Sequence, residues 1–262
     1  MTAEPEPREV SEATPKPRSR GIYLLPNLLT TAGLFAGFFA IVAAINGRFE
    51  AAAIAVFVAM LLDGVDGRIA RMTNTQSAFG AEYDSLVDMV AFGLAPALVI
   101  YQWCLLALGK VGWLVAFIYT ACAALRLARF NSQNSGVEKR YFKGLASPSA
   151  AAIVAAFVWL GVDNMESPGT VMPWIGLLLT LIAGLLMVSN ILYRSFKDFD
   201  MKDKVPFVVL VVIVLVFVLV SSDPPIVLFV GFLIYALSGP VGALLRRGSS
   251  QATAPSEDKG PS

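Results

Sequence analysis

The sequence predicts an all-α membrane protein, a polytopic bundle of about eight transmembrane helices. Two observations support this class: the composition and the grouping of the apolar residues. Of the 262 residues, 56% are hydrophobic and 15% are charged, whereas a soluble domain has about 25% charged residues. Most of the apolar segments approach the ~20 residues that a helix needs to cross a bilayer. The eight segments are Leu24–Ile45, Ala51–Ile69, Phe79–Tyr101, Val111–Phe130, Ser149–Val162, Val171–Leu192, Pro206–Val220 and Ile226–Leu245.

Polar and turn-forming residues separate several of these segments. Asn46-Gly47 follows the first, 167–169 follows the fifth, and 223–225 follows the seventh. Residues 1–20 contain no apolar run and so cannot form the core of a signal peptide. We predict a disordered N-terminal tail at 1–20, a transmembrane catalytic domain at 21–247 and a disordered C-terminal tail at 248–262.

The positions of the cations predict the orientation in the membrane. With the N-terminus in the cytoplasm and eight spans, all of the 20 Lys and Arg residues lie on the inner side except Arg48 and Lys110. An excess of Lys and Arg in inner loops is the normal pattern of membrane proteins. We therefore expect an integral protein of a bacterial-type inner membrane, with both termini and the connection between the second and third segments in the cytoplasm.

Four aspartates occupy that connection at helical spacing. Asp63 and Asp66 are three residues apart, and Asp84 and Asp88 are four apart, so each pair shares one helix face. The 12 apolar residues 51–62 and the 13 residues 89–101 cover ~18 and ~20 Å of a ~30 Å core. Asp63 and Asp88 should thus lie at matched depth, where a charge costs ~2.5 kcal/mol or more unless it is paired, hydrated or bound to metal.

Three interpretations of the aspartates are open. Arg68 and Arg71 could neutralise two of them, which would leave two buried charges. A cation transporter would need polar residues that continue to the outer face, but residues 51–60 are wholly apolar. We favour a divalent metal cluster that binds phosphate oxygens, because hard cations take oxygen ligands, with Arg71 as a further phosphate partner. The sequence contains no histidine, which excludes a histidine-based zinc site.

The aspartates belong to a longer motif that resembles the signature of the CDP-alcohol phosphotransferase family. It reads Asp63-Gly64-Val65-Asp66-Gly67-x-x-Ala70-Arg71, then eight residues, then Gly80-x-x-x-Asp84-x-x-x-Asp88. The resemblance implies an intramembrane enzyme, usually a homodimer, with a core of six helices. Such an enzyme displaces CMP from a CDP-linked lipid or alcohol with an alcohol hydroxyl, and it needs Mg²⁺ or Mn²⁺, here in an expected two-ion site. No nucleic acid partner is expected.

The resemblance also implies roles for individual residues. Asp63, Asp66 and Asp84 would be metal ligands. Asp88 would be the general base and would also contact the metal. A carboxylate base suits a chain without histidine. The residues expected to bind the nucleotide and its phosphates are Asn27, Thr30, Gly67, Ala70, Arg71 and Gly80.

Several stretches outside the motif resemble the phosphatidylserine synthase branch of this family, namely 20–27, 92–97, 125–131, 142–148, 187–189 and 193–197. This resemblance implies CDP-diacylglycerol and L-serine as substrates. Arg126, Arg129 and Lys143 would then bind the serine carboxylate or the lipid phosphate, although cations at inner helix ends also serve orientation and contact anionic lipids. The alternatives are another acceptor, such as glycerol phosphate or inositol phosphate, and a divalent-cation transporter.

The first segment contains Gly33 and Gly37, four residues apart. Small residues at this spacing let two helices approach closely. The partner could be another helix of the same chain or a second copy of the chain.

Overall fold

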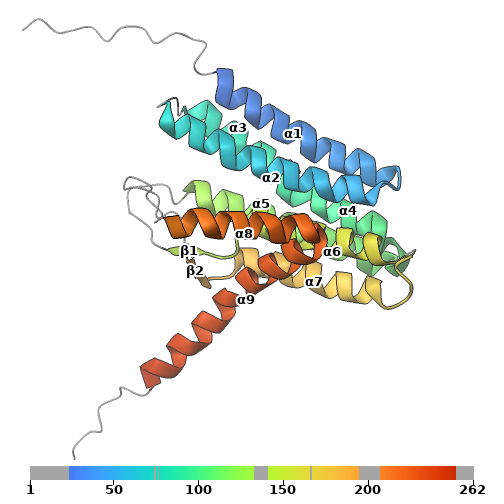
Figure 1. Cartoon of the computed structure of the whole chain (residues 1–262). Coiled ribbons are helices and arrows are strands. Elements are labelled where there is room, and N and C mark those ends of the chain that lie inside the picture. Colours follow the sequence, from blue (N-terminus) through green and yellow to red (C-terminus); the bar gives the residue numbers. More distant parts are fainter. Residues whose placement is uncertain are drawn as a thin grey trace, which may run out of the picture.

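The computed structural model describes residues 24–73, 75, 77–132, 141–165, 167–194 and 207–251 (Figure 1). Within these residues the chain is almost entirely helical. The helices are α1 (Leu24–Ile45), α2 (Phe49–Met72), α3 (Ala78–Asp88), η2 (Met89–Leu94), α4 (Ala95–Trp103), η3 (Leu105–Leu108), α5 (Lys110–Ser132), α6 (Ser147–Asn164), α7 (Met172–Val188), α8 (Phe207–Ser222) and α9 (Pro224–Gln251).

Each predicted apolar segment corresponds to one helical rod. The third is composite, because α3, the π-helical turn η2 and α4 follow one another without a break from Ala78 to Trp103. The last rod, α9, reaches Gln251 and so passes the predicted domain end at 247. The predicted tail at 1–20, and residues 252–262 of the other tail, lie outside the described residues.

Two short strands were not predicted from the sequence. β1 (Tyr141–Lys143) pairs antiparallel with β2 (Leu192–Arg194), and α7 therefore ends at Val188 instead of continuing to residue 192. Gly144 follows β1 with a φ of 83°, a value that favours glycine. A Cβ there would lie 2.2 Å from the Met187 carbonyl oxygen, so glycine alone fits between the pair of strands and α6.

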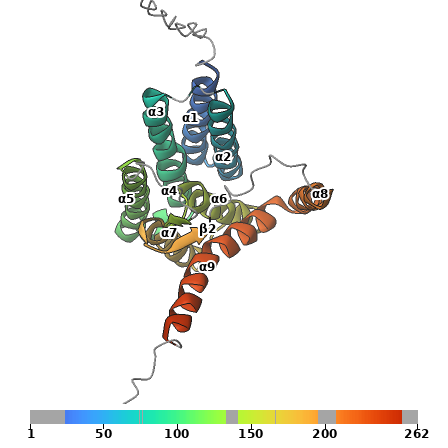
Figure 2. The ribbon, with the colours of Figure 1, turned by 90° about the vertical axis from the view of Figure 1, so that its left-hand side faces the viewer.

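Helix α6 lies at the centre of the bundle and packs against α2, α4, α7 and α9. Five of its eleven buried positions are alanines, including Ala150, Ala151 and Ala155, which are all fully buried. Small side chains allow close approach of helices in a membrane. By contrast, α8 stands apart from the other helices and joins the bundle through α9 (Figure 2).

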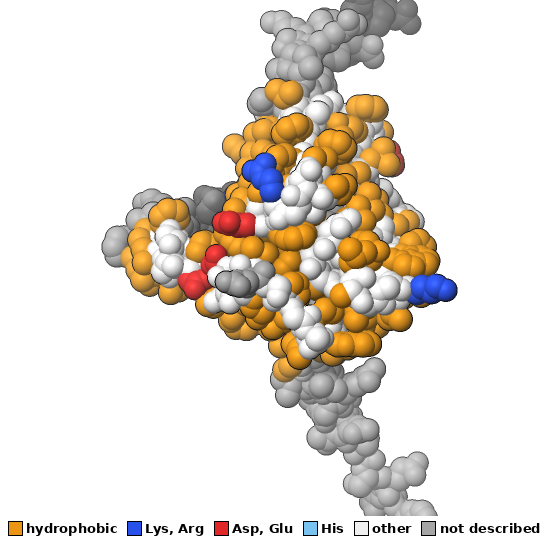
Figure 3. All heavy atoms as spheres, turned by 90° about the vertical axis from the view of Figure 1, so that its right-hand side faces the viewer, with side chains coloured by type: hydrophobic (Ala, Val, Ile, Leu, Met, Phe, Trp, Pro, Cys, Tyr) orange, Lys and Arg blue, Asp and Glu red, His pale blue; other side chains and the backbone are white. Residues whose placement is uncertain are grey.

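The chain is an integral membrane protein. Among the described residues, four stretches are helical, long and apolar enough to cross a bilayer: Pro26–Ile45, Ala78–Trp103, Lys110–Ser132 and Pro224–Ala243. The apolar helix α7 is shorter, and α2 carries charged residues in its second half. The face drawn in Figure 3 is largely hydrophobic, with few charged side chains, as expected of a protein surrounded by lipid.

The two glycines of α1 provide a test of this packing. A Cβ on Gly37 would lie 2.9 Å from the Ala91 Cα of η2, whereas a Cβ on Gly33 would meet no atom closer than 3.8 Å. The close contact of Gly37 is thus within the chain.

Gly37→Ala should lower the thermal unfolding midpoint in detergent, because overpacking costs about 1 to 3 kcal/mol. Gly33→Ala is the matched control and should be neutral or stabilising, since alanine is the better helix former by about 1 kcal/mol. Equal unfolding midpoints for the two variants would contradict the close packing of Gly37 against Ala91 of η2.

Candidate active site

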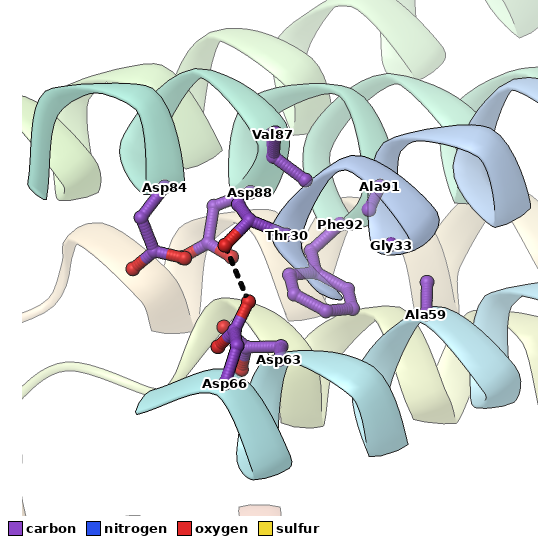
Figure 4. A pocket seen from close by; sticks show the side chains of 10 residues that line it. All are labelled: Thr30, Gly33, Ala59, Asp63, Asp66, Asp84, Val87, Asp88, Ala91 and Phe92. Atoms are coloured by element: carbon purple, nitrogen blue, oxygen red, sulfur yellow. Dashed lines mark hydrogen bonds between the residues drawn. The ribbon is translucent and has the colours of Figure 1, made fainter. Parts of the chain in front are cut away.

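The four aspartates converge between α2 and α3. Asp63 and Asp66 point from α2 toward Asp84 and Asp88 on α3 (Figure 4). One carboxylate oxygen from each of Asp63, Asp66 and Asp84 lies within 4.8 Å of the others. Asp66 is buried, with 4% of its surface exposed, and the other three are half-buried.

Helix α1 connects the two acidic helices. The hydroxyl of Thr30 lies 2.8 Å from Asp66 Oδ2 and donates to it (Figure 4). At the next residue of α1, the hydroxyl oxygens of Thr31 and of Tyr83 on α3 are hydrogen-bonded at 2.9 Å. Helix α3 begins at Ser77, whose hydroxyl accepts from the Gly80 N–H at 3.0 Å, the usual N-cap arrangement. These bonds fix where the aspartates of α2 and α3 stand relative to each other.

The interactions of the four carboxyl groups are mostly with one another. Asp63 and Asp88 are in side-chain contact with each other. Arg126 on α5 interacts electrostatically with Asp88. Arg68 and Arg71 are both exposed and are not among the groups that act on the aspartates. Internal pairing with Arg68 and Arg71 therefore does not explain the cluster.

The donor set fits a divalent cation. Three convergent carboxylates supply the hard oxygen ligands that Mg²⁺ and Mn²⁺ take, and one facing arginine does not balance four acidic groups. The four side chains also line a small cavity. Its remaining wall is apolar except for Thr30 and consists of Gly33, Ala59, Val87, Ala91 and Phe92 (Figure 4).

Of the residues predicted to bind the nucleotide, one lines this cavity and the others do not. Thr30 lines it. Asn27 is half-buried, and its Oδ1 would lie 3.7 Å from a Cβ on Gly80. A Cβ on Gly67 would meet nothing within 4 Å, so packing among the described residues does not require glycine there. Ala70 is half-buried and Arg71 is exposed in the last turn of α2.

The three cations predicted for the acceptor have different partners. None of them lines the cavity. Arg126 donates from Nη1 to Ser147 Oγ at 2.7 Å, and its Nε is buried without a hydrogen-bond partner among the described residues. Arg129 donates to the Val188 carbonyl and to Asn190 Oδ1, both at 3.4 Å. Lys143 is exposed on β1.

Two polar partners near the site were missed by the sequence analysis. Ser147, fully buried at the start of α6, holds the guanidinium of Arg126. Asn131 at the end of α5 donates to Ser85 Oγ at 3.0 Å and so joins α5 to the helix that carries Asp84 and Asp88. Both residues lie in or beside stretches singled out above, but their partners are 21 and 46 residues away, and no local pattern indicates them.

Known proteins resemble this chain over the same region. Residues 23–182 match the CDP-alcohol phosphatidyltransferase family. A relative from Helicobacter pylori, named CDP-diacylglycerol–serine O-phosphatidyltransferase, is 40% identical over 200 residues, which are 75% of this chain and 83% of the relative. A protein of the same name from Mycobacterium tuberculosis is 39% identical over 159 residues, covering 58% of this chain and 55% of the relative. An archaetidylserine synthase from Methanothermobacter thermautotrophicus is 33% identical over 171 residues, covering 64% and 69%.

The matched region contains α1 to α6 and most of α7, and with them all four aspartates, Thr30 and Arg126. The match thus includes both the helices that build the cavity and the carboxylates that converge in it. By this agreement of sequence and site, the chain belongs to the CDP-alcohol phosphatidyltransferase family.

Proposed function

We propose that this protein transfers the phosphatidyl group of CDP-diacylglycerol to the hydroxyl of L-serine, giving phosphatidylserine and CMP. The proposal depends on one observation above all. A relative named CDP-diacylglycerol–serine O-phosphatidyltransferase is 40% identical to this chain, and the alignment covers 83% of that relative. The convergent aspartates supply the acidic site that such a reaction requires.

Asp63, Asp66 and Asp84 would hold the divalent cations, Mg²⁺ or Mn²⁺ in a two-ion site, with Asp88 at its edge. In favour of this site, one carboxylate oxygen from each of Asp63, Asp66 and Asp84 lies within 4.8 Å of the others. The Asp88 side chain lies beside these three (Figure 4). When bound, the cations offset the charge of the diphosphate and stabilise the leaving CMP phosphate. The protein's part is to fix the ligands in advance, which Thr30 does for Asp66.

Asp88 is the proposed general base. The serine hydroxyl oxygen attacks the phosphorus that carries the diacylglycerol, the bond from that phosphorus to the CMP oxygen breaks, and the hydroxyl proton passes to the Asp88 carboxylate. Asp88 is in side-chain contact with Asp63 and faces Arg126, so it stands between the acidic cluster and a cation. This position suits a group that must meet the acceptor beside the metal ligands.

Arg126 is the best placed of the predicted acceptor residues. Ser147 fixes its guanidinium at 2.7 Å, and its Nε remains a buried donor without a partner among the described residues. A carboxylate of serine or a phosphate oxygen of the lipid would accept from such a donor. Arg129 and Lys143 are not among the groups that act on Asp88, and they would then contribute mainly to the charge of the entrance.

The nucleotide would lie at the cytoplasmic mouth, near Asn27, Thr30, Gly67, Ala70, Arg71 and Gly80. The empty space beside Gly67 supports this placement, because a substrate could approach the backbone there. The apolar inner wall formed by Ala59, Ala91 and Phe92 suits a site that opens to one side only.

We further propose that all eight rods cross the membrane, that residues 21–247 form one catalytic domain whose core is α1 to α7, and that the protein works as a homodimer. The orientation with both termini and the site in the cytoplasm is supported by the cations, since only Arg48 and Lys110 would lie outside. Helices α8 and α9 lie beyond the family match and would serve as scaffold or dimer surface.

The activity can be tested with purified protein, CDP-diacylglycerol, Mn²⁺ and a panel of labelled acceptors: serine, glycerol phosphate, inositol phosphate and inositol. We expect label in the lipid fraction from serine alone, with release of CMP in equal amount. A lipid product from one of the other acceptors, with none from serine, would contradict the proposed acceptor.

Asp88→Asn should lower kcat by at least about a hundredfold, because a positioned base contributes ~10² to 10⁴ in rate. Binding of CDP-diacylglycerol should remain measurable, since Asp63, Asp66 and Asp84 are retained. Kinetics and equilibrium binding on the same preparation check both parts. Asp163→Asn, at an exposed position near the end of α6, is the control. Lost binding together with residual turnover would exclude Asp88 as the base.

Arg126→Ala should raise the KM for serine about tenfold or more, since a hydrogen bond to a charged group contributes about 1.5 to 3 kcal/mol. The KM for CDP-diacylglycerol should change less. Arg129→Ala removes the same charge three residues away and should change the serine KM less than Arg126→Ala does. A serine KM that is unchanged in Arg126→Ala would remove this residue from the acceptor site.

A further inference from the structure

The helix that carries Asp84 and Asp88 is interrupted directly after Asp88. Residues Met89–Leu94 form the π-helical turn η2, and the N–H of Ala95 bonds to the carbonyl of Val90, five residues back. Such turns are rare, appear mostly as single turns within α-helices, and are frequent at functional sites. Here the turn joins the acidic half of the rod to its buried half.

The π turn determines which way the aspartates face. It places one extra residue in the rod, and each residue of an α-helix rotates the chain by ~100° about the helix axis. The following half, α4, is anchored by fully buried side chains such as Ala95, Val99 and Ile100. If η2 became α-helical, Asp84 and Asp88 would therefore turn by ~100° relative to α4 and away from Asp63 and Asp66.

Helix α5 holds the turn in its π form. The hydroxyl of Tyr119 donates to the Phe92 carbonyl at 3.1 Å, and the hydroxyl of Thr120 lies 3.4 Å from the Gly93 carbonyl. Tyr119 has no exposed surface, so without this acceptor its hydroxyl would be buried and unsatisfied. A π turn leaves carbonyls without their usual intrahelical partners, and Tyr119 supplies a donor to one of them. The Thr120 hydroxyl has its shorter bond, 3.0 Å, to the Ala116 carbonyl of its own helix, so its contact with Gly93 is secondary.

Two close backbone contacts clamp the same turn. A Cβ on Gly37 of α1 would lie 2.9 Å from the Ala91 Cα, and a Cβ on Gly93 would lie 3.2 Å from the Ala123 Cβ of α5. Glycine at both positions lets α1 and α5 close on η2 from either side. The clamped residues reach the site itself, because Ala91 and Phe92 line the acidic cavity (Figure 4).

We propose that Tyr119 is a positioning residue for the acidic site. Its hydroxyl fixes the π turn, and the turn holds Asp84 and Asp88 opposite Asp63 and Asp66 in the arrangement that binds the cation and takes up the proton. Tyr119 does not line the cavity and acts through the Phe92 carbonyl. The catalytic part of this inference rests on the function proposed above, whereas the part concerning cation binding does not.

The test compares Tyr119→Phe with Tyr193→Phe. Tyr193 is a matched control, since it is also buried (1% exposed) and its hydroxyl also donates to a helix carbonyl, that of Ala236, at 3.0 Å. Each variant loses one buried hydroxyl donor. Mn²⁺ affinity is measured from the electron paramagnetic resonance signal of free Mn²⁺, and kcat and KM are measured with CDP-diacylglycerol and serine.

We expect Tyr119→Phe to weaken Mn²⁺ binding and to lower kcat at least about tenfold, because misplacing reacting groups by ~1 Å can cost ~10²-fold in rate. The KM for serine should change much less than kcat. Tyr193→Phe should lower the thermal midpoint to a similar degree but leave kcat and Mn²⁺ affinity near the values of the unmodified protein. Equal kcat and Mn²⁺ affinity in the two variants would overturn the proposal.

A second variant covers the case in which Tyr119→Phe does not fold. Thr120→Val keeps the side-chain shape and removes a hydroxyl that lies 3.0 Å from the Ala116 carbonyl and 3.4 Å from the Gly93 carbonyl. Because only the longer of these contacts reaches η2, the variant should shift Mn²⁺ affinity and kcat in the same direction by a smaller factor. An unchanged Mn²⁺ affinity in this variant would count against the clamp. If the unmodified protein binds Mn²⁺ but makes no phosphatidylserine, the proposed function fails, while the comparison of Mn²⁺ affinities still decides the role of Tyr119.

Discussion

Mutual repulsion among four carboxyl groups is the constraint on which the rest of this structure depends. Asp66 is buried and the other three are half-buried, so water screens these groups less than it does at a surface. Among the described side chains, Arg126 alone brings a positive charge to them. Bound cations would therefore stabilise this arrangement. Before cations bind, packing by the surrounding helices must keep the four carboxyl groups together against their repulsion.

Helices α1 and α5 hold the aspartate-bearing helices in place from two sides. Thr30 and Thr31 of α1 hydrogen-bond to residues of α2 and α3, and Gly37 brings the same helix against η2. Tyr119 of α5 satisfies the turn from the other side. Neither helix contributes a carboxylate to the cluster, yet each fixes the direction of the helices that do. In a membrane, where apolar burial drives helix association weakly, such hydrogen bonds and close glycine contacts are the available means.

The sequence was sufficient for the helices and for the convergence of the aspartates, because both depend on local spacing. Three and four residues place Asp63 with Asp66 and Asp84 with Asp88 on shared faces, and a hairpin of two apolar helices brings the faces together. Local spacing could not predict the π turn, because its contacts come from α5. The hydroxyls of Tyr119 and Thr120 each lie near a carbonyl 27 residues earlier in the chain, that of Phe92 and that of Gly93. The pairing of β1 with β2 and the bond of Arg126 to Ser147 likewise join distant residues. Hydropathy also could not decide how many of the eight rods span the membrane, because α2 carries its charges within the helix.

The division of labour among the helices bears on how one family can serve different acceptors. The acidic motif lies on α2 and α3, and the chemistry of displacing CMP needs nothing more specific than metal ligands and a base. The residues that would distinguish an acceptor come from α5 and the start of α6, where Ser147 holds Arg126 beside Asp88. Because the proposed acceptor residues and the proposed cation ligands belong to different helices, we expect substitutions around Arg126 to alter the acceptor without disturbing the cation ligands. As the proposed base, Asp88 would have to suit both sets, and this would restrict how far the acceptor site can move along α5.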